Sequence, residues 1–205
     1  MKPQEIEKLS FKIIEQEAQE HAFSDEEWPI VRRMIHTSAD FDYINTIRFY
    51  PEAVQKGIAA IKKGCQIFTD TNMARVGIRK KEIREFGGNV RCLIADEAIA
   101  KKAKEKGTTR ALAAVDMACE QMKDDIYVVG NAPTALLRLI ELIKEKRAKP
   151  ALVIGFPVGF VNAAESKEAL MTLDIPYITN KGRKGGSNIA ASIVNALTIM
   201  AFEHR

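Results

Sequence analysis

The sequence predicts an α/β protein, a three-layer α/β/α sandwich with a mostly parallel, doubly wound sheet. Short, continuous apolar runs of strand length alternate with segments of helical periodicity from about residue 42 onward. Strands without a polar face are typical of a parallel sheet that helices cover on both sides. The 205 residues, 46% of them apolar and 28% charged, suffice for one sizeable core.

The first part of the chain is expected to be helical. Apolar residues recur at helical spacing over residues 4–20. A second helix is expected to begin near Ser24, because Glu27 three residues later completes a capping box. Residues 42–50, DYINTIRFY, alternate and are rich in β-branched and aromatic side chains, so we interpret them as the first strand.

The rest of the chain alternates between strands and helices, and crossovers of the usual right hand give the doubly wound arrangement. The expected strands are 65–70, 89–96, 126–133, 151–159 and 176–182. The expected helices are 51–64, 97–107, 108–122, 134–147, 163–173 and 187–202. Because no linker or repeat interrupts this order, residues 1–205 are expected to form one domain, with a helical segment of about residues 1–35 packed on the α/β core.

Composition excludes several classes of function. A net charge of +4, from 31 basic and 27 acidic residues, is too mild to indicate nucleic-acid or membrane-surface binding. We expect a soluble, cytoplasmic protein, because the sequence shows neither a signal-peptide pattern nor an apolar run of the roughly 20 residues that a membrane span needs. Cys65, Cys92 and Cys119 are widely spaced, which disfavours a disulfide framework or a metal site.

Polar and glycine-rich segments follow the expected strands. In an open parallel sheet, ligands bind beyond the carboxyl ends of the strands, and these segments lie there, at 69–74, 95–97, 130–135, 155–163 and 179–188. Turns between strands and helices favour Gly, Asn, Asp and Pro in any protein. We nevertheless expect one composite site, since several strand ends carry such segments.

The segment TNKGRKGGSN, residues 179–188, combines glycines with Lys184 and a helix start at Ser187. Free N–H groups at a helix start and basic side chains predict an anion site, with a solvated loop as the alternative. The P-loop and dinucleotide fingerprints are absent, which counts against a nucleotide-dependent enzyme. Phe156 and Phe160 could form an apolar wall for a flat ligand, or pack beneath a loop.

The stretch RRMIHTSADFD, residues 32–42, holds the candidate acid-base group His36. Unperturbed imidazole titrates near pH ~6.5, so histidine is suited to donate or accept a proton at neutrality. Asp40 and Asp42 could orient the ring. A surface or helix-capping histidine is the alternative interpretation.

Seven blocks of the chain resemble the precorrin-8X methylmutase family of cobalamin biosynthesis, also called cobalt-precorrin-8 methylmutases. The blocks are SFKIIEQEA, RRMIHTSADFD, TDTNMARVGI, GTTRALAAVD, GNAPTAL, IGFPVGFVNAAESKEAL and NKGRKGGSNIAASIVNAL, in that order over nearly the whole chain. The resemblance implies an α/β/α homodimer that uses no dissociable cofactor. Nothing in the sequence offers a set of metal ligands.

The resemblance implies an isomerase that moves a methyl group from C-11 to C-12 of precorrin-8X or cobalt-precorrin-8, giving hydrogenobyrinic acid or cobyrinic acid. It places the catalytic proton donor or acceptor at His36 and substrate contacts at Ser10 and Arg33, with Arg110 in the same site. The substrate is a flat ring fringed by carboxylates, so further contacts are expected at the strand ends, at Thr71, Asn72, Lys184, Gly185 and Ser187. A corrinoid-binding or product-carrier module without catalysis is the alternative.

Overall fold

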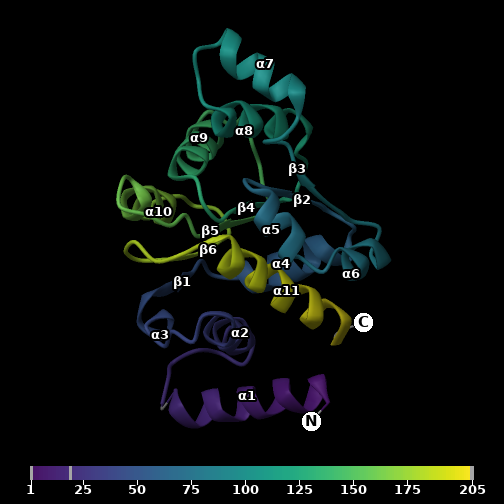
Figure 1. Cartoon of the computed structure of the whole chain (residues 1–205), viewed down its shortest axis with the longest axis vertical. Coiled ribbons are helices and arrows are strands. Elements are labelled where there is room, and N and C mark those ends of the chain that lie inside the picture. The colour runs from purple at the N-terminus through teal and green to yellow at the C-terminus, as the bar shows by residue number, and fades with distance from the viewer. Residues whose placement is uncertain (1, 19, 204–205) are drawn as a thin grey trace.

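A computed structural model describes residues 2–18 and 20–203 and shows a six-stranded sheet between two helical layers (Figure 1). The strands are β1 (Ile47–Phe49), β2 (Gln66–Thr69), β3 (Asn89–Cys92), β4 (Ile126–Val129), β5 (Leu152–Gly155) and β6 (Tyr177–Asn180). Their order is β1-β6-β5-β4-β2-β3, and every pairing is parallel except that of β1 with β6. The predicted α/β class and the mostly parallel sheet are confirmed.

Helices cover both faces of the sheet. One layer contains α2 (Trp28–Ser38), α3 (Tyr43–Thr46), α4 (Ala53–Lys62), α5 (Asn72–Gly77), α6 (Lys80–Glu85) and α11 (Ser187–Glu203). The other contains α7 (Glu97–Glu105), α8 (Arg110–Gln121), α9 (Pro133–Lys144) and α10 (Ala163–Met171). Helix α1 (Pro3–Glu17) lies at the end of the molecule and packs on α2, which packs on α11 (Figure 1). This packing supports the single-domain interpretation, which stays a prediction.

The strands are apolar throughout because both of their faces are buried. In β4, Ile126 and Val128 belong to the core beneath α11, whereas Tyr127 and Val129 belong to the core beneath α8 and α9. Alternating side chains of a strand point to opposite faces, so an uninterrupted apolar run is what two cores require.

The direction of winding reverses between β2 and β4. The chain goes from β2 outward to β3, returns to β4 on the other side of β2, and continues to β5 and β6. The carboxyl ends of β2 and β4, at Thr69 and Val129, therefore border the switch point where open α/β sheets bind ligands.

Residues 42–50 differ from the sequence prediction, since they form α3 and only a three-residue strand. The carboxylate of Asp40 accepts a hydrogen bond from the backbone N–H of Asp42 at 3.0 Å, and the carbonyl of Asp42 accepts from the N–H groups of Asn45 and Thr46 at 3.1 Å. Local turn chemistry of this kind outweighs the β-propensity of the side chains that follow. The short helices α5 and α6 were also not predicted.

The predicted capping box forms one turn ahead of α2. The Glu27 N–H donates to the Ser24 hydroxyl at 3.3 Å, and the Ser24 N–H donates to the Glu27 carboxylate at 3.1 Å. The two bonds satisfy N–H groups at the start of the helical region that carries His36.

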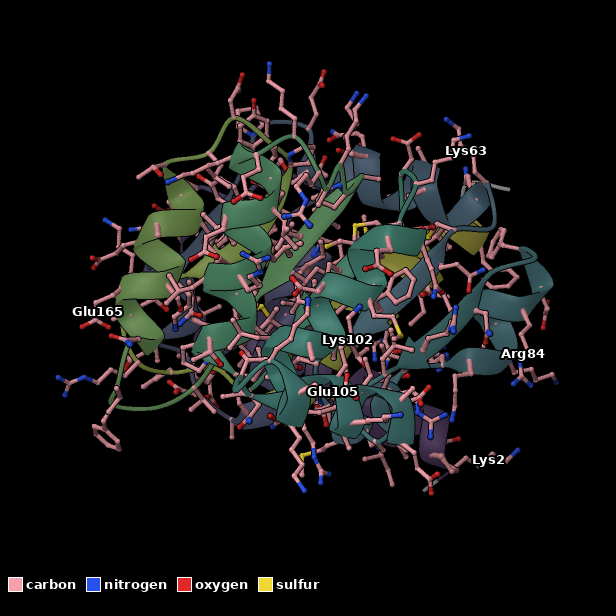
Figure 2. All side chains as sticks on the ribbon, turned by 90° about the horizontal axis from the view of Figure 1, so that it is seen from above. Lys2, Lys63, Arg84, Lys102, Glu105 and Glu165 are labelled. Atoms are coloured by element: carbon pink, nitrogen blue, oxygen red, sulfur yellow. The ribbon has the colours of Figure 1, made fainter. Side chains whose placement is uncertain are left out.

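The surface carries mixed charge. Lys63, Arg84 and Glu165 project outward at the periphery (Figure 2), and Lys102 pairs with Glu120 at 3.3 Å. Among the described residues, no helix combines the length and the apolar character needed to cross a membrane.

Candidate active site

His36 lies in the last turn of α2 and is exposed. The inner side of this helix is made of Ile30, Val31, Met34 and Ile35, all buried in the core. Helix α2 ends two residues after His36, because Ala39 adopts the left-handed conformation with φ of 54°. The imidazole is thus carried by a firmly packed helix but remains open to a ligand.

The ring of Phe11, on α1, contacts three side chains of α2. It meets the His36 imidazole edge-on, with centroids 5.2 Å apart and planes at 71°. The guanidinium carbons of Arg32 and Arg33 lie 4.4 and 5.3 Å from the same ring centroid. Edge-to-face and cation–π contacts of this kind are favourable, so Phe11 connects the candidate acid-base group with both arginines.

Carboxylates of α1 pair with these arginines. Arg33 Nη2 lies 3.2 Å from Glu7 Oε1, and Arg32 forms an ion pair with Glu15. Glu7 and Glu15 are about half exposed, and ion pairs at such positions contribute little to stability. A carboxylate of a ligand could therefore take the place of Glu7 on Arg33 at small cost.

A pocket of about 260 Å³ opens beside His36. Ser10 lies in its wall together with His36, and apolar side chains supply much of the remaining lining, among them Ile13, Ile14, Ile35 and Phe41. Arg33 lines a neighbouring cleft of about 280 Å³ with Phe11 and Glu7. Because pockets that enclose drug-sized ligands measure about 300–1,000 Å³, the pocket at His36 can hold part of a macrocycle but not the whole ring.

The predicted contacts Thr71 and Ser187 meet at the switch point. Their hydroxyl oxygens lie 2.7 Å apart, and Thr71 also caps α5 by accepting from the Ala74 N–H at 3.1 Å. Gly130 is needed beside them, since a Cβ atom there would lie 2.6 Å from Ser187 Cα. The side-chain oxygen of Asn72 accepts a hydrogen bond from Arg75 Nε at 3.0 Å on the exposed start of α5.

Asp70 holds the turn that follows β4. Its buried carboxylate accepts hydrogen bonds from the N–H groups of Gly130, Asn131 and Ala132, each at 2.8 Å. Burial raises the pKa of Asp70, and these three donors oppose that rise. The carboxylate therefore fixes the backbone on one side of the switch point.

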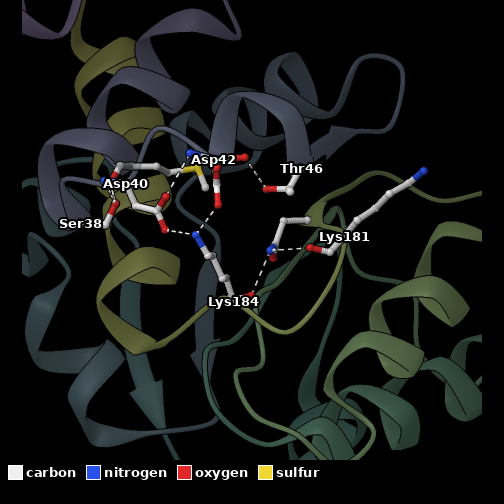
Figure 3. Close-up of polar contacts among 8 residues, drawn as sticks. Ser38, Asp40, Asp42, Thr46, Lys181 and Lys184 are labelled. Atoms are coloured by element: carbon white, nitrogen blue, oxygen red, sulfur yellow. Dashed lines mark hydrogen bonds and ion pairs between the residues drawn. The ribbon is translucent and has the colours of Figure 1, made fainter. Parts of the chain in front are cut away.

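Lys184 connects the glycine-rich turn to the segment after His36. Its Nζ atom lies 2.6 Å from Asp40 Oδ2 and 2.7 Å from Asp42 Oδ2 (Figure 3). The hydrogen bond from Lys184 lowers the pKa of Asp40. Both carboxylates point to the ammonium group rather than to the imidazole, which differs from the prediction that they orient His36.

Phe156 lies outside the candidate pocket. Its side chain is fully buried in the core, and its carbonyl accepts from the Gly186 N–H at 2.9 Å. A Cβ atom at Gly185 would lie 2.3 Å from that carbonyl oxygen, so the turn requires glycine there. Of the two interpretations of Phe156, packing beneath the loop is the one that its burial supports, whereas Phe160 is 83% exposed.

The structure brings together some of the predicted site residues and separates others. Ser10 and His36 share a pocket, and Arg33 adjoins it across Phe11. Arg110 begins α8, which lies in the other helical layer and toward the opposite end of the molecule from α2 (Figure 1). Within a single chain, Arg110 therefore lies far from His36 and does not share its pocket (Figure 1).

Sequence reasoning missed Phe11, Asp70 and Lys167. A signal for Lys167 existed, because Ala163 and Leu170 lie four residues before it and three after it, on the buried face of the same helix. Within residues 2–18 and 20–203, no group of three or more His, Cys, Asp or Glu side chains could hold a metal ion.

Comparisons with known proteins show which family the chain resembles. The family model for precorrin-8X methylmutase matches residues 5–200. A cobalt-precorrin-8 methylmutase of Priestia megaterium is 49% identical, over 98% of this chain and 89% of its own length. A precorrin-8X methylmutase of Sinorhizobium sp is 37% identical, over 92% and 90%.

A solved structure shows the same fold. The precorrin-8x methyl mutase from Thermus Thermophilus superposes with a TM-score of 0.90 at 44% identity and covers 97% of this chain and 98% of its own. On these matches the chain belongs to the precorrin-8X methylmutase family, whose members are isomerases of cobalamin biosynthesis.

Proposed function

We propose that this family member moves a methyl group from C-11 to C-12 of precorrin-8X or cobalt-precorrin-8, with His36 as the proton donor or acceptor. The supporting observation is the pocket that an exposed imidazole and Ser10 line together with apolar side chains. A hydroxyl, an imidazole and an apolar surface suit the edge of a conjugated ring.

The migration requires the electrons of the ring system to be redistributed. Protonation by His36, or a hydrogen bond from it, makes the conjugated system electron-poor and lowers the barrier to methyl movement. The proton returns to the imidazole once the double bonds have shifted. A positioned general acid contributes about 10²–10⁴-fold, and orientation by the pocket adds to this.

Ser10 and Arg33 are the proposed contacts to the substrate edge. The guanidinium group of Arg33 is suited to a carboxylate side arm of the ring, and its present partner Glu7 is half exposed and replaceable. Thr71, Asn72, Gly185 and Ser187 are proposed contacts farther along the ring, at the carboxyl edge of the sheet, with Arg110 as an additional cation. Lys184 was predicted as a cation of this rim, but its ammonium group is engaged by two carboxylates.

We propose a homodimer as the working assembly. Ile6, Leu9 and Ile13 of α1 are 51%, 47% and 43% exposed, and they lie at helical spacing along one side of the helix that walls the pocket. A second copy of the chain would cover this surface and enlarge the enclosure around the ring. Light scattering during size-exclusion chromatography should give twice the mass of one chain.

The proposed reaction is intramolecular, so no dissociable cofactor or resident metal is needed. The proposed location is the cytoplasm, because Cys65, Cys92 and Cys119 are free thiols and a reducing compartment keeps them so.

The purified protein should convert one of the two corrinoids over several turnovers. Precorrin-8X and cobalt-precorrin-8 are offered separately, and the change in visible absorbance that accompanies methyl migration is followed. Conversion identifies the substrate and its metal content. Tight binding of both without conversion would support a carrier module and contradict the proposal.

A further inference from the structure

Lys184 is exposed, yet both its ammonium group and its backbone carbonyl are held by other residues. The ammonium group lies 2.6 Å from Asp40 and 2.7 Å from Asp42. Its backbone carbonyl accepts hydrogen bonds from the Lys167 ammonium at 2.7 Å and from Asn180 Nδ2 at 3.0 Å. Arg33 has one replaceable carboxylate partner, whereas the ammonium group of Lys184 has two. These contacts indicate a structural role for Lys184 rather than ligand binding.

Lys167 holds the glycine-rich turn that follows β6. Its side chain is fully buried on α10, and its ammonium donates to the carbonyl of Lys184 and, at 3.2 Å, to the side-chain oxygen of Asn180. Both acceptors are uncharged. Burying an ammonium group without a carboxylate is costly, and an apolar side chain would fill the space more favourably. We therefore assign Lys167 the role of holding the glycine-rich turn in place.

The network crosses from one helical layer to the other around the end of β6. Lys167 comes from α10 in the second layer, whereas Asp40 and Asp42 lie between α2 and α3 in the first. The N–H of Lys181 also donates to the carbonyl of Thr46 on α3, at 2.9 Å. Figure 3 shows the turn spanning from Lys181 to Lys184 against this segment.

We propose that Lys184 is a positioning residue, which fixes the segment after α2 and thereby the place of His36, while Lys167 fixes Lys184. Asp40 follows His36 by four positions and directly succeeds the left-handed Ala39 that ends the helix. Restraining Asp40 and Asp42 restrains the last turn of α2, so the glycine-rich turn of β6 sets where the imidazole stands. This inference rests on the proposed role of His36.

Two sets of variants separate positioning from substrate binding. Lys184→Met removes the ammonium, and the Asp40→Asn, Asp42→Asn pair removes its carboxylate partners. If Lys184 positions His36, each change lowers kcat by about 10- to 100-fold, the loss typical of small misplacements in a site, and alters the Kd of the corrin product little. Because all three side chains then act as one unit, combining the changes should lower kcat no further. Lys184→Arg should restore part of the activity.

Lys181→Met is the matched control. Lys181 belongs to the same turn and carries the same charge, but its side chain points away from Asp40 and Asp42 (Figure 3). The kcat of Lys181→Met and its Kd for the corrin product should stay at the parent values.

Three results would overturn the inference. In the first, Lys184→Met weakens product binding with kcat unchanged. In the second, the aspartate pair variant binds product more tightly, because a freed ammonium then binds the ligand. In the third, the losses in kcat add. If Lys184→Met does not fold, the two aspartate substitutions on the surface still decide. A parent protein that converts neither corrinoid instead refutes the proposed function, and with it the need to position His36.

Discussion

The imidazole of His36 and the ring of Phe11 meet edge-on with 5.2 Å between their centroids, so that α1 restrains the candidate acid-base group of α2. Phe11→Leu should lower kcat by about tenfold, because leucine keeps the apolar contact but not the ring that orients the imidazole and the guanidinium groups. Steady-state kinetics, together with the Kd of the product, checks this.

Phe23→Leu is the control for that substitution. Phe23 packs against Trp28 and Phe49 rather than against His36. It should lose stability, as Phe11→Leu does, but keep the parent kcat. Equal turnover by the two variants would remove Phe11 from the site.

Asp70→Asn should destabilise the fold by about 2–4 kcal/mol, because an amide group then turns a donor toward backbone N–H donors that are buried or half-buried. The free energy of unfolding in urea measures this effect. Asp96→Asn is the comparison, since Asp96 caps α7 with one exposed hydrogen bond from Ala98 and asparagine caps equally well. A loss of similar size in both variants would contradict the role assigned to Asp70.

Lys167→Met should remove a pH-dependent part of the stability. Burial lowers the pKa of Lys167 from 10.5 to about 8, so between these values the unfolded chain binds the proton more tightly than the folded one. The contribution of Lys167 to stability therefore rises as pH increases from about 8 to 10.5, by at most about 3 kcal/mol.

The measurement is the difference in Tm between parent and Lys167→Met at a series of pH values. The parent should gain relative to the variant as pH rises from 8 toward 10. A difference that stays constant across this range would show that Lys167 keeps its proton in the folded protein.

The fold could be predicted from the sequence because its strands bury both faces. The apolar runs of β4 and β5 are typical of a parallel sheet covered on both faces, and the capping residues Ser24 and Glu27 mark the approach to α2. The prediction of one strand over residues 42–50 was wrong because Asp40 and Asp42 form turns through hydrogen bonds with the backbone. Residue propensities do not include such bonds.

The site was less predictable, since its contacts join distant parts of the chain. His36 was singled out by its chemistry and Ser10 by the family resemblance, but the pairing of Lys184 with Asp40 depends on how β6 lies beside α3. Phe156 is flanked by glycine and proline in the sequence, yet only the packing of the turn shows that its ring is buried. Charge and ring neighbours of this kind emerge from tertiary structure alone.

The most direct test of the account is a single-turnover reaction of His36→Ala with the corrinoid that the parent converts. Thr37→Ala, a neighbouring exposed change on α2, serves as the control. The account predicts that His36→Ala binds the substrate but isomerises it about 10²–10⁴-fold more slowly, while Thr37→Ala keeps the parent rate. Isomerisation by His36→Ala at close to the parent rate would contradict it.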